Sequence, residues 1–196
     1  MTKVKICGIT RVSDAIAAVD AGADFIGLVL SSSPRRVDIT QVEPIVNAVR
    51  EKAHVVGVFA SEIDLIGYDR TSAIALDYYQ VYFEYQDLVV RKPRRAWIRS
   101  FWAHEQTDIG ALANGDLLLC DFKHEAKRDS YHVPGGCAAF LRERTLIAGK
   151  LTVDNVAAVV RALRPFGVDV ARGTELSPGV KDVKKIEQFI ARAQNA

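Results

Sequence analysis

Three residues of this sequence have side chains that suit acid–base chemistry on an anionic small molecule: Cys7, Asp121 and Arg35. Cys7 follows the apolar run VKI and precedes a glycine, while Asp121 follows the run LLLC. A thiol whose pKa is lowered can remove a proton, and a carboxylic acid can donate one. Arg35, in the loop SSSPRR, carries a permanent charge on a planar fork that fits a carboxylate.

Several glycines form a second group with a different use. Gly135 and Gly136 precede a helical pattern, Gly149 follows the apolar run TLIA, and Gly173 follows the run GVDV and a short Ala-Arg step. Glycine turns that open onto helix N-termini bind anions, because the free N–H groups and the helix dipole favour negative charge. Together with the cation of Arg35, they predict a small phosphorylated substrate that carries a second anionic group. No cofactor signature and no metal-binding motif accompany them.

The elements that must hold these residues alternate between short apolar runs and longer amphipathic stretches. The runs are VKIC (4–7), DFIGLVL (24–30), HVVGVFA (54–60), LDYYQVYF (76–83), RAWIRSFW (95–102), DLLLCDF (116–122), TLIAG (145–149) and GVDV (167–170). They are apolar almost throughout, which is typical of strands covered on both faces. Eight strand–helix units favour a closed (β/α)₈ TIM barrel, small and nearly free of insertions, as one domain over residues 1–196.

A barrel of this kind carries its functional groups at the carboxyl ends of the strands and in the loops that follow. Cys7, Gln80 and Asp121 lie at the ends of three predicted strands, and Arg35 and Arg172 lie in the loops after two others. We therefore expect these residues to meet at one mouth of the barrel. Taken alone, a cysteine such as Cys7 is more often a small buried core residue than a catalyst, and its place at a strand end, with Asp121 at another, favours function.

Composition restricts the class of protein further. The chain has 196 residues, 49% of them hydrophobic, and a net charge of +2, which argues against a dedicated nucleic-acid or membrane-surface binder. No run of about 18 apolar residues predicts a membrane span, and the first ten residues lack the apolar stretch of a signal peptide. The cysteines are few and widely spaced, so we expect a reducing, cytoplasmic location and neither disulfides nor zinc. Monomer and homodimer are both compatible with the sequence.

Six blocks of the sequence together resemble the phosphoribosylanthranilate isomerase family. The blocks are KICGIT (5–10), SSSPRRV (31–37), VGVF (56–59), LLLCDF (117–122), IAGKLTVDNV (147–156) and GVDVARGTELSPGVKD (167–182). They occur in the family's order at the predicted strand ends and span nearly the whole chain. Each block is a weak signal alone, whereas the combination is specific.

The resemblance implies a cofactor-independent Amadori rearrangement in tryptophan biosynthesis, from an aminoaldose phosphate to an aminoketose phosphate. It implies that Asp121 is the general acid, which protonates the furanose ring oxygen and opens the ring to a Schiff base. It implies that Cys7 is the general base, which removes the proton from C2′. Arg35 would pair with the anthranilate carboxylate.

The sequence departs from the family pattern in four loops. After the fourth strand, QVYF at 80–83 keeps Gln80 but otherwise differs from the family's QLHG. After the sixth strand, GGCA at 135–138 replaces a GGTG-like loop. After the seventh and eighth strands, Lys150 and Arg172 replace small residues. In one interpretation Lys150 and Arg172 contact the phosphate with their side chains, where the family uses backbone amides. In the others the chain is a related isomerase for a different phosphorylated substrate, or a non-catalytic barrel that binds an anionic ligand or a protein partner.

Overall fold

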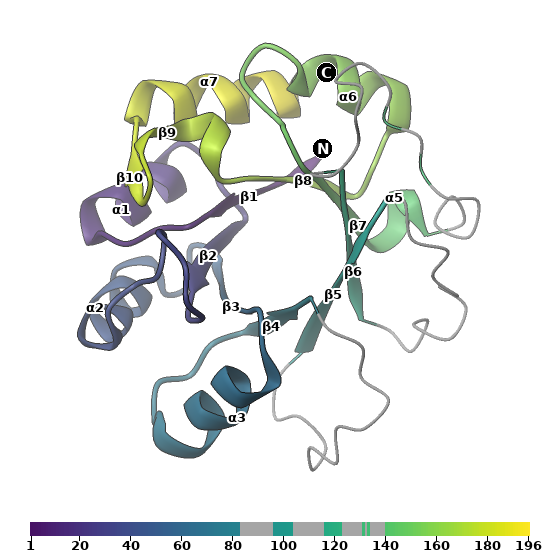
Figure 1. Ribbon diagram of the computed structural model, residues 1–196. Coiled ribbons are helices and arrows are strands. Elements are labelled where there is room, and N and C mark those ends of the chain that lie inside the picture. Colours follow the sequence, from purple (N-terminus) through teal and green to yellow (C-terminus); the bar gives the residue numbers. More distant parts are fainter. Residues whose placement is uncertain (83–95, 104–115, 123–130, 132, 134–139) are drawn as a thin grey trace.

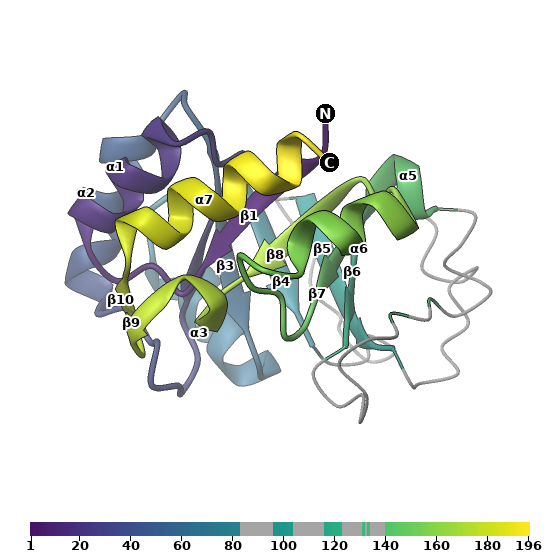
Figure 2. The same cartoon turned by 90° about the horizontal axis from the view of Figure 1, so that it is seen from above.

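A computed structural model describes residues 1–82, 96–103, 116–122, 131, 133 and 140–196 of the chain. Figure 1 shows these residues as a ring of strands with helices packed around the outside. The amino and carboxyl ends of the chain lie close together at one end of the ring, as Figures 1 and 2 both show.

Eight parallel strands close into a barrel in chain order, and β8 pairs with β1 to complete the ring. The strands are β1 (Lys3–Cys7), β2 (Phe25–Val29), β3 (His54–Phe59), β4 (Tyr78–Val81), β5 (Ala96–Trp102), β6 (Leu117–Asp121), β7 (Thr145–Ala148) and β8 (Gly167–Val170). Each of the eight predicted runs thus contains one strand, and the predicted (β/α)₈ barrel is confirmed.

Six helices are described, and they lie outside the ring of strands (Figure 1). They are α1 (Val12–Asp20), α2 (Ile39–Val49), α3 (Glu62–Thr71), α5 (Leu141–Arg144), α6 (Val156–Leu163) and α7 (Val183–Gln194). The amphipathic stretch EQTDIGALANG predicts a helix at 105–115, which falls outside the described residues. The stretch CAAFLRER predicts a helix at 137–144, and α5 accounts for its last four residues.

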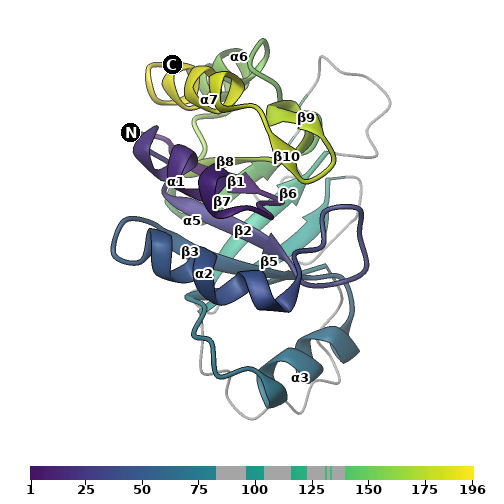
Figure 3. The ribbon, with the colours of Figure 1, turned by 90° about the vertical axis from the view of Figure 1, so that its left-hand side faces the viewer.

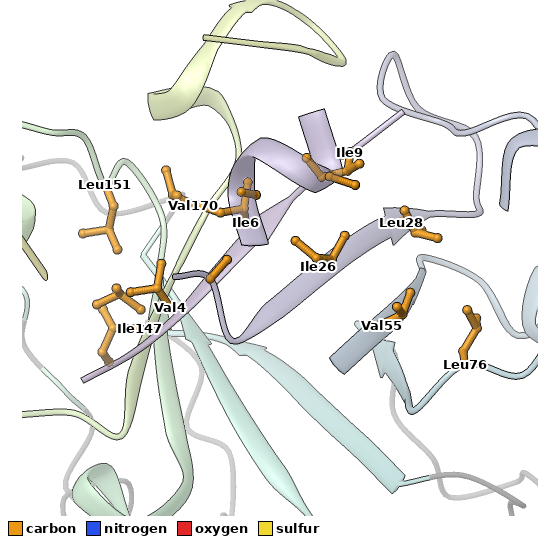
Figure 4. Close-up of a cluster of buried hydrophobic side chains, with 14 of the residues drawn as sticks. Val4, Ile6, Ile9, Ile26, Leu28, Val55, Leu76, Ile147, Leu151 and Val170 are labelled. Atoms are coloured by element: carbon orange, nitrogen blue, oxygen red, sulfur yellow. The ribbon is translucent and has the colours of Figure 1, made fainter. Parts of the chain in front are cut away.

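Side chains on the strands alternate between two apolar cores. Outward-facing residues such as Ile6, Ile26 and Leu28 are fully buried between the barrel and its helices (Figure 4). Inward-facing residues such as Val56 and Leu119 fill the barrel interior in a separate cluster. Because successive side chains on a strand point to opposite faces, the same alternation turns polar residues of the strands into the barrel.

A short hairpin between β8 and α7 was not predicted. It follows a 3₁₀ turn (Arg172–Thr174) and consists of β9 (Glu175–Ser177) and β10 (Val180–Lys181), which pair antiparallel beside the barrel mouth (Figure 3). The amphipathic stretch VKDVKKIEQFIARAQ predicts a closing helix from residue 180, but α7 begins only at Val183. Its N-cap is Asp182, whose side chain accepts a hydrogen bond from the backbone of Lys185.

Candidate active site

A cavity of about 840 Å³ lies at the carboxyl ends of the strands. The described residues that line it come from strand ends and loops in seven parts of the chain: Cys7, Val29, Arg35, Val58, Tyr82, Asp121, Ala148, Gly149, Lys150, Leu151, Thr152, Asn155, Asp169, Val170, Ala171, Arg172 and Gly173. Cys7, Arg35, Asp121, Gly149, Lys150, Arg172 and Gly173 are among the residues predicted for the site, and the tertiary fold brings them together around one space.

Cys7 stands beside a buried ion pair inside the barrel. Lys5 is fully buried, and its Nζ lies 2.8 Å from Oδ1 of Asp169 on the neighbouring strand β8, directly opposite in register. The same ammonium group interacts with the thiol of Cys7. Burial alone would discharge Lys5, but Asp169 and Cys7 outweigh this effect and raise its pKa. The thiol therefore faces a permanent positive charge.

Gly27 on β2 makes room for this arrangement. It lies opposite Cys7 in the register of β1 and β2. A methyl group at Gly27 would approach within 2.9 Å of the Cys7 sulfur and 3.0 Å of Lys5 Nζ. Side chains rarely pack this closely, so only glycine leaves both groups in place.

Burial dominates the environment of the Cys7 thiol, although cations stand beside it. Burial inside the barrel raises the pKa of Cys7, because a thiolate is poorly solvated there. The ammonium groups of Lys5 and Lys181 act in the opposite direction and offset only part of that effect, while Asp169 adds to it. The cations are present as expected, but desolvation dominates.

Asp121 ends β6 and is almost completely buried in the cavity wall. Its Oδ2 accepts a hydrogen bond from the hydroxyl of Tyr82 at 3.4 Å. The Tyr82 hydroxyl in turn accepts one from Nε2 of Gln80 at 3.2 Å. Gln80 is fully buried and does not line the cavity, although the sequence predicted that it binds the substrate.

Arg35 binds a partner within the protein. Its Nε and Nη2 lie 2.8 and 2.7 Å from the two carboxylate oxygens of Glu175 on β9, which is a bidentate pairing. Lys181 Nζ approaches the same carboxylate at 3.2 Å. A guanidinium group has five N–H donors in a planar fork, so the edge that carries Nη1 remains able to receive a second carboxylate.

The loops after β7 and β8 form the remaining side of the cavity. Lys150 has a left-handed backbone, with φ of 55°, directly after Gly149, with φ of 92°. Gly173 packs against the next residue of the first loop, because a Cβ there would approach the carbonyl oxygen of Leu151 to 2.1 Å. This contact holds the loop of Lys150 against the loop of Arg172. Both long cationic side chains are exposed at the rim.

Two predicted residues, Gly135 and Gly136, lie outside the described part of the chain. Five further residues of the site were not predicted from the sequence, and each interacts with a predicted residue or with another of the five: Lys5, Asp169, Tyr82, Glu175 and Lys181. A signal for two of them was available: Lys5 and Asp169 interrupt apolar strands at positions that alternate in phase with Cys7.

The family model of N-(5'phosphoribosyl)anthranilate (PRA) isomerase matches residues 4–192 of the chain. The chain belongs to this family. A relative from Pelobacter propionicus with the name N-(5'-phosphoribosyl)anthranilate isomerase is 34% identical, and the match covers 99% of this chain and 96% of the relative. A relative of the same name from Citrifermentans bemidjiense is 36% identical, with 99% and 98% covered.

Solved structures of the phosphoribosylanthranilate isomerase family agree with this assignment. The structure from Thermotoga maritima superposes with a TM-score of 0.78 at 29% identity, and the match covers 100% of both chains. Another, described as a complex with reduced 1-(o-carboxyphenylamino)-1-deoxyribulose 5-phosphate, gives a TM-score of 0.77 at 28% identity. The resemblance inferred from six sequence blocks is therefore confirmed over the whole chain.

Proposed function

We propose that this protein is an isomerase that converts N-(5-phosphoribosyl)anthranilate to 1-(o-carboxyphenylamino)-1-deoxyribulose 5-phosphate in tryptophan biosynthesis. The observation that carries the proposal is the meeting of Cys7 and Asp121 at one cavity, in a chain that belongs to the phosphoribosylanthranilate isomerase family. A base and an acid at the same mouth are what an aldose–ketose rearrangement requires.

In the first step the carboxylic acid of Asp121 protonates the furanose ring oxygen. The bond from that oxygen to C1′ breaks, and the nitrogen lone pair forms a C1′=N bond, which leaves a protonated Schiff base. The position of Asp121 in the cavity wall supports this role, because a general acid must lie within hydrogen-bond reach of the atom that it protonates.

In the second step the Cys7 thiolate removes the proton from C2′. The electrons of that C–H bond form the C1′=C2′ bond and neutralise the iminium nitrogen. The resulting enolamine gains a proton at C1′ and loses one from the 2′-hydroxyl group, which completes the ketose. The iminium charge adds to that of Lys5 beside the sulfur, and both favour the thiolate that burial alone disfavours.

Two cationic regions of the cavity suit the two anionic ends of this substrate. We assign the anthranilate carboxylate to the free edge of Arg35, whose orientation the pairing with Glu175 supports. We assign the phosphate to the loops of Gly149, Lys150, Arg172 and Gly173. Barrels often bind a phosphate after strands 7 and 8. The side chains of Lys150 and Arg172 add positive charge at this rim.

The isomerase assay tests the proposal directly. Purified protein is expected to consume phosphoribosylanthranilate, followed as the loss of anthranilate-type fluorescence. Cys7→Ala and Asp121→Ala are each expected to lower kcat by at least about 10²-fold, the usual scale for acid–base groups. Cys120→Ala is the matched control, because this second buried thiol lies in the outer core, away from the cavity. A kcat that stays at the wild-type value in both variants would contradict the assigned roles.

The altered loops motivate two alternatives that the same experiment separates. Turnover of another aminoaldose phosphate in preference to phosphoribosylanthranilate would indicate a related isomerase. Retained binding of a phosphorylated ligand with no turnover of any of them would indicate a non-catalytic barrel.

The cellular location and the oligomeric state of the enzyme are inferred in the same way. We infer a cytoplasmic enzyme that works as a monomer or a homodimer, without nucleic-acid or membrane partners. Within the described part of the chain, no helix has the length and apolar character needed to span a bilayer. One solved structure of the family, from Thermotoga maritima, is described as monomers generated from a dimeric enzyme. Light scattering of this protein distinguishes the two states.

A further inference from the structure

The hydroxyl group of Tyr82 lies between two buried polar groups in the cavity wall. It accepts a hydrogen bond from Gln80 Nε2 at 3.2 Å and donates one to Oδ2 of Asp121 at 3.4 Å. Gln80 is fully buried on β4 and anchors the chain of contacts behind the cavity. Tyr82 itself lines the cavity, so it links a fixed support to the candidate acid.

The aromatic ring of Tyr82 is also held. It packs on the ring of Trp102 at the end of β5, with centroids 5.3 Å apart and planes tilted by 34°. A ring fixed on one side and a hydroxyl fixed on the other leave the phenol little freedom to turn away from Asp121.

Tyr82 keeps its proton at neutral pH. Burial is the main cause that raises its pKa well above the usual value, and Asp121 on β6, Asp169 on β8 and Cys7 on β1 add to it. The hydroxyl of Ser100 on β5 lowers the pKa of Tyr82 and offsets only a part of this rise. Lys5, the cation beside Cys7, is paired with Asp169. Tyr82 is therefore a permanent donor toward Asp121.

A donor at one oxygen of a carboxyl group decides which oxygen carries the acid proton. Oδ2 of Asp121 uses a lone pair to accept from Tyr82, so a proton on that oxygen would compete with the incoming O–H. The proton is better placed on Oδ1, the other oxygen. A general acid works only when its proton points at the atom that receives it.

We propose that Tyr82 is a positioning residue that orients the carboxyl group of Asp121 and directs its proton from Oδ1 into the cavity. The proposal rests on the proposed isomerase function, and it adds a residue that the QLHG pattern of the family does not contain. Tyr82 stands where that pattern has histidine.

The test is Tyr82→Phe, which keeps the ring on Trp102 and removes only the hydroxyl. Turnover of phosphoribosylanthranilate is expected to fall about tenfold in kcat, the low end for a hydrogen bond to an ionisable group, with KM changed by less than about threefold. The limb of the pH–rate profile that reports Asp121 should move to higher pH, because the ionised carboxylate has lost a donor. A structural defect alone would not move that limb.

Tyr79→Phe is the matched control. Tyr79 lies on β4, three positions before Tyr82, but its hydroxyl donates to Asp69 at 3.0 Å on the outer side of the barrel. It should leave kcat and the pH profile unchanged. A Tyr82→Phe enzyme with wild-type kcat and an unmoved profile would overturn the proposal for Tyr82. Lack of turnover by the wild-type protein would instead overturn the proposed function, so the two failures are distinguishable.

Discussion

At the scale of single residues, the site depends on how closely side chains can approach inside a barrel. Cys7 and Lys5 occupy the same face of β1, two positions apart, and both point at Gly27 on β2. The Lys5 ammonium stabilises a thiolate only at short range. A glycine in this strand is thus explained by the chemistry beside it as well as by the fold.

Gly27→Ala tests this close approach. The added methyl group must displace Cys7 or Lys5, and because a shift of about 1 Å can cost about 10²-fold in rate, we expect kcat to fall at least about tenfold. Gly67→Ala is the control, since nothing lies within 4 Å of a Cβ at this position of α3. That change should leave kcat intact and stabilise the protein by about 0.5–1 kcal/mol. Equal kcat in the two variants would refute the argument.

At the scale of elements, the hairpin of β9 and β10 connects three regions that are distant in sequence. Glu175 on β9 holds Arg35 from the loop after β2 and Lys181 from β10. The backbone of Lys181 also donates to Asp14 in α1. The hairpin therefore orients a substrate-binding candidate while it fastens the loop after β8 to the first helix.

The charge on Glu175 makes this connection dependent on pH. Partial burial would raise the pKa of Glu175, but hydrogen bonds and ion pairs from Arg35 and Lys181 outweigh it and hold the pKa below its usual value. A carboxyl group whose pKa is lower when folded stabilises the protein above the unfolded value of about 4.3, and this contribution is lost as the pH falls through the folded value.

Glu175→Gln should therefore lower the urea midpoint at pH 7, and the difference from wild type should shrink as the pH falls from about 5 toward 3. Asp20→Asn is the control, because Asp20 and Lys52 form an exposed pair at 3.7 Å that contributes little. Midpoints that differ by the same amount at every pH would show that the charge of Glu175 is not the cause.

At the scale of the whole molecule, closure of the sheet joins all strands into one structure. Each strand from β1 to β8 is paired on both sides, so no strand can leave without breaking two ladders. The outer core between strands and helices contains residues of all eight strands, and Figure 4 shows a part of it. We therefore expect the described barrel to unfold as a single cooperative unit.

Leu28→Ala probes this cooperativity. Leu28 on β2 is fully buried, and its truncation is expected to cost about 2–5 kcal/mol. Trp97 and Trp102 lie three strands away on β5. The unfolding midpoint followed by their fluorescence should therefore fall as much as the midpoint followed by far-ultraviolet circular dichroism. Leu176→Ala, at a leucine that is 69% exposed, should change stability by less than about 0.5 kcal/mol. An unchanged fluorescence midpoint in Leu28→Ala would show that the two sides unfold separately.

The sequence by itself determined the barrel and most of its mouth. Eight apolar runs are enough to predict eight covered strands, and the rule that function lies at their carboxyl ends selects Cys7, Asp121 and Arg35 without any coordinates. These inferences succeed because they depend on local patterns and on a fixed topology.

Only the tertiary structure decided which groups face one another. Burial raises the pKa of Cys7 although cations stand beside it, and Arg35 is already paired with Glu175. Tyr82 in the loop after β4 meets Asp121, which is 39 positions away. The solvation and the partners of a side chain are set by residues remote in sequence, so no local pattern contains them.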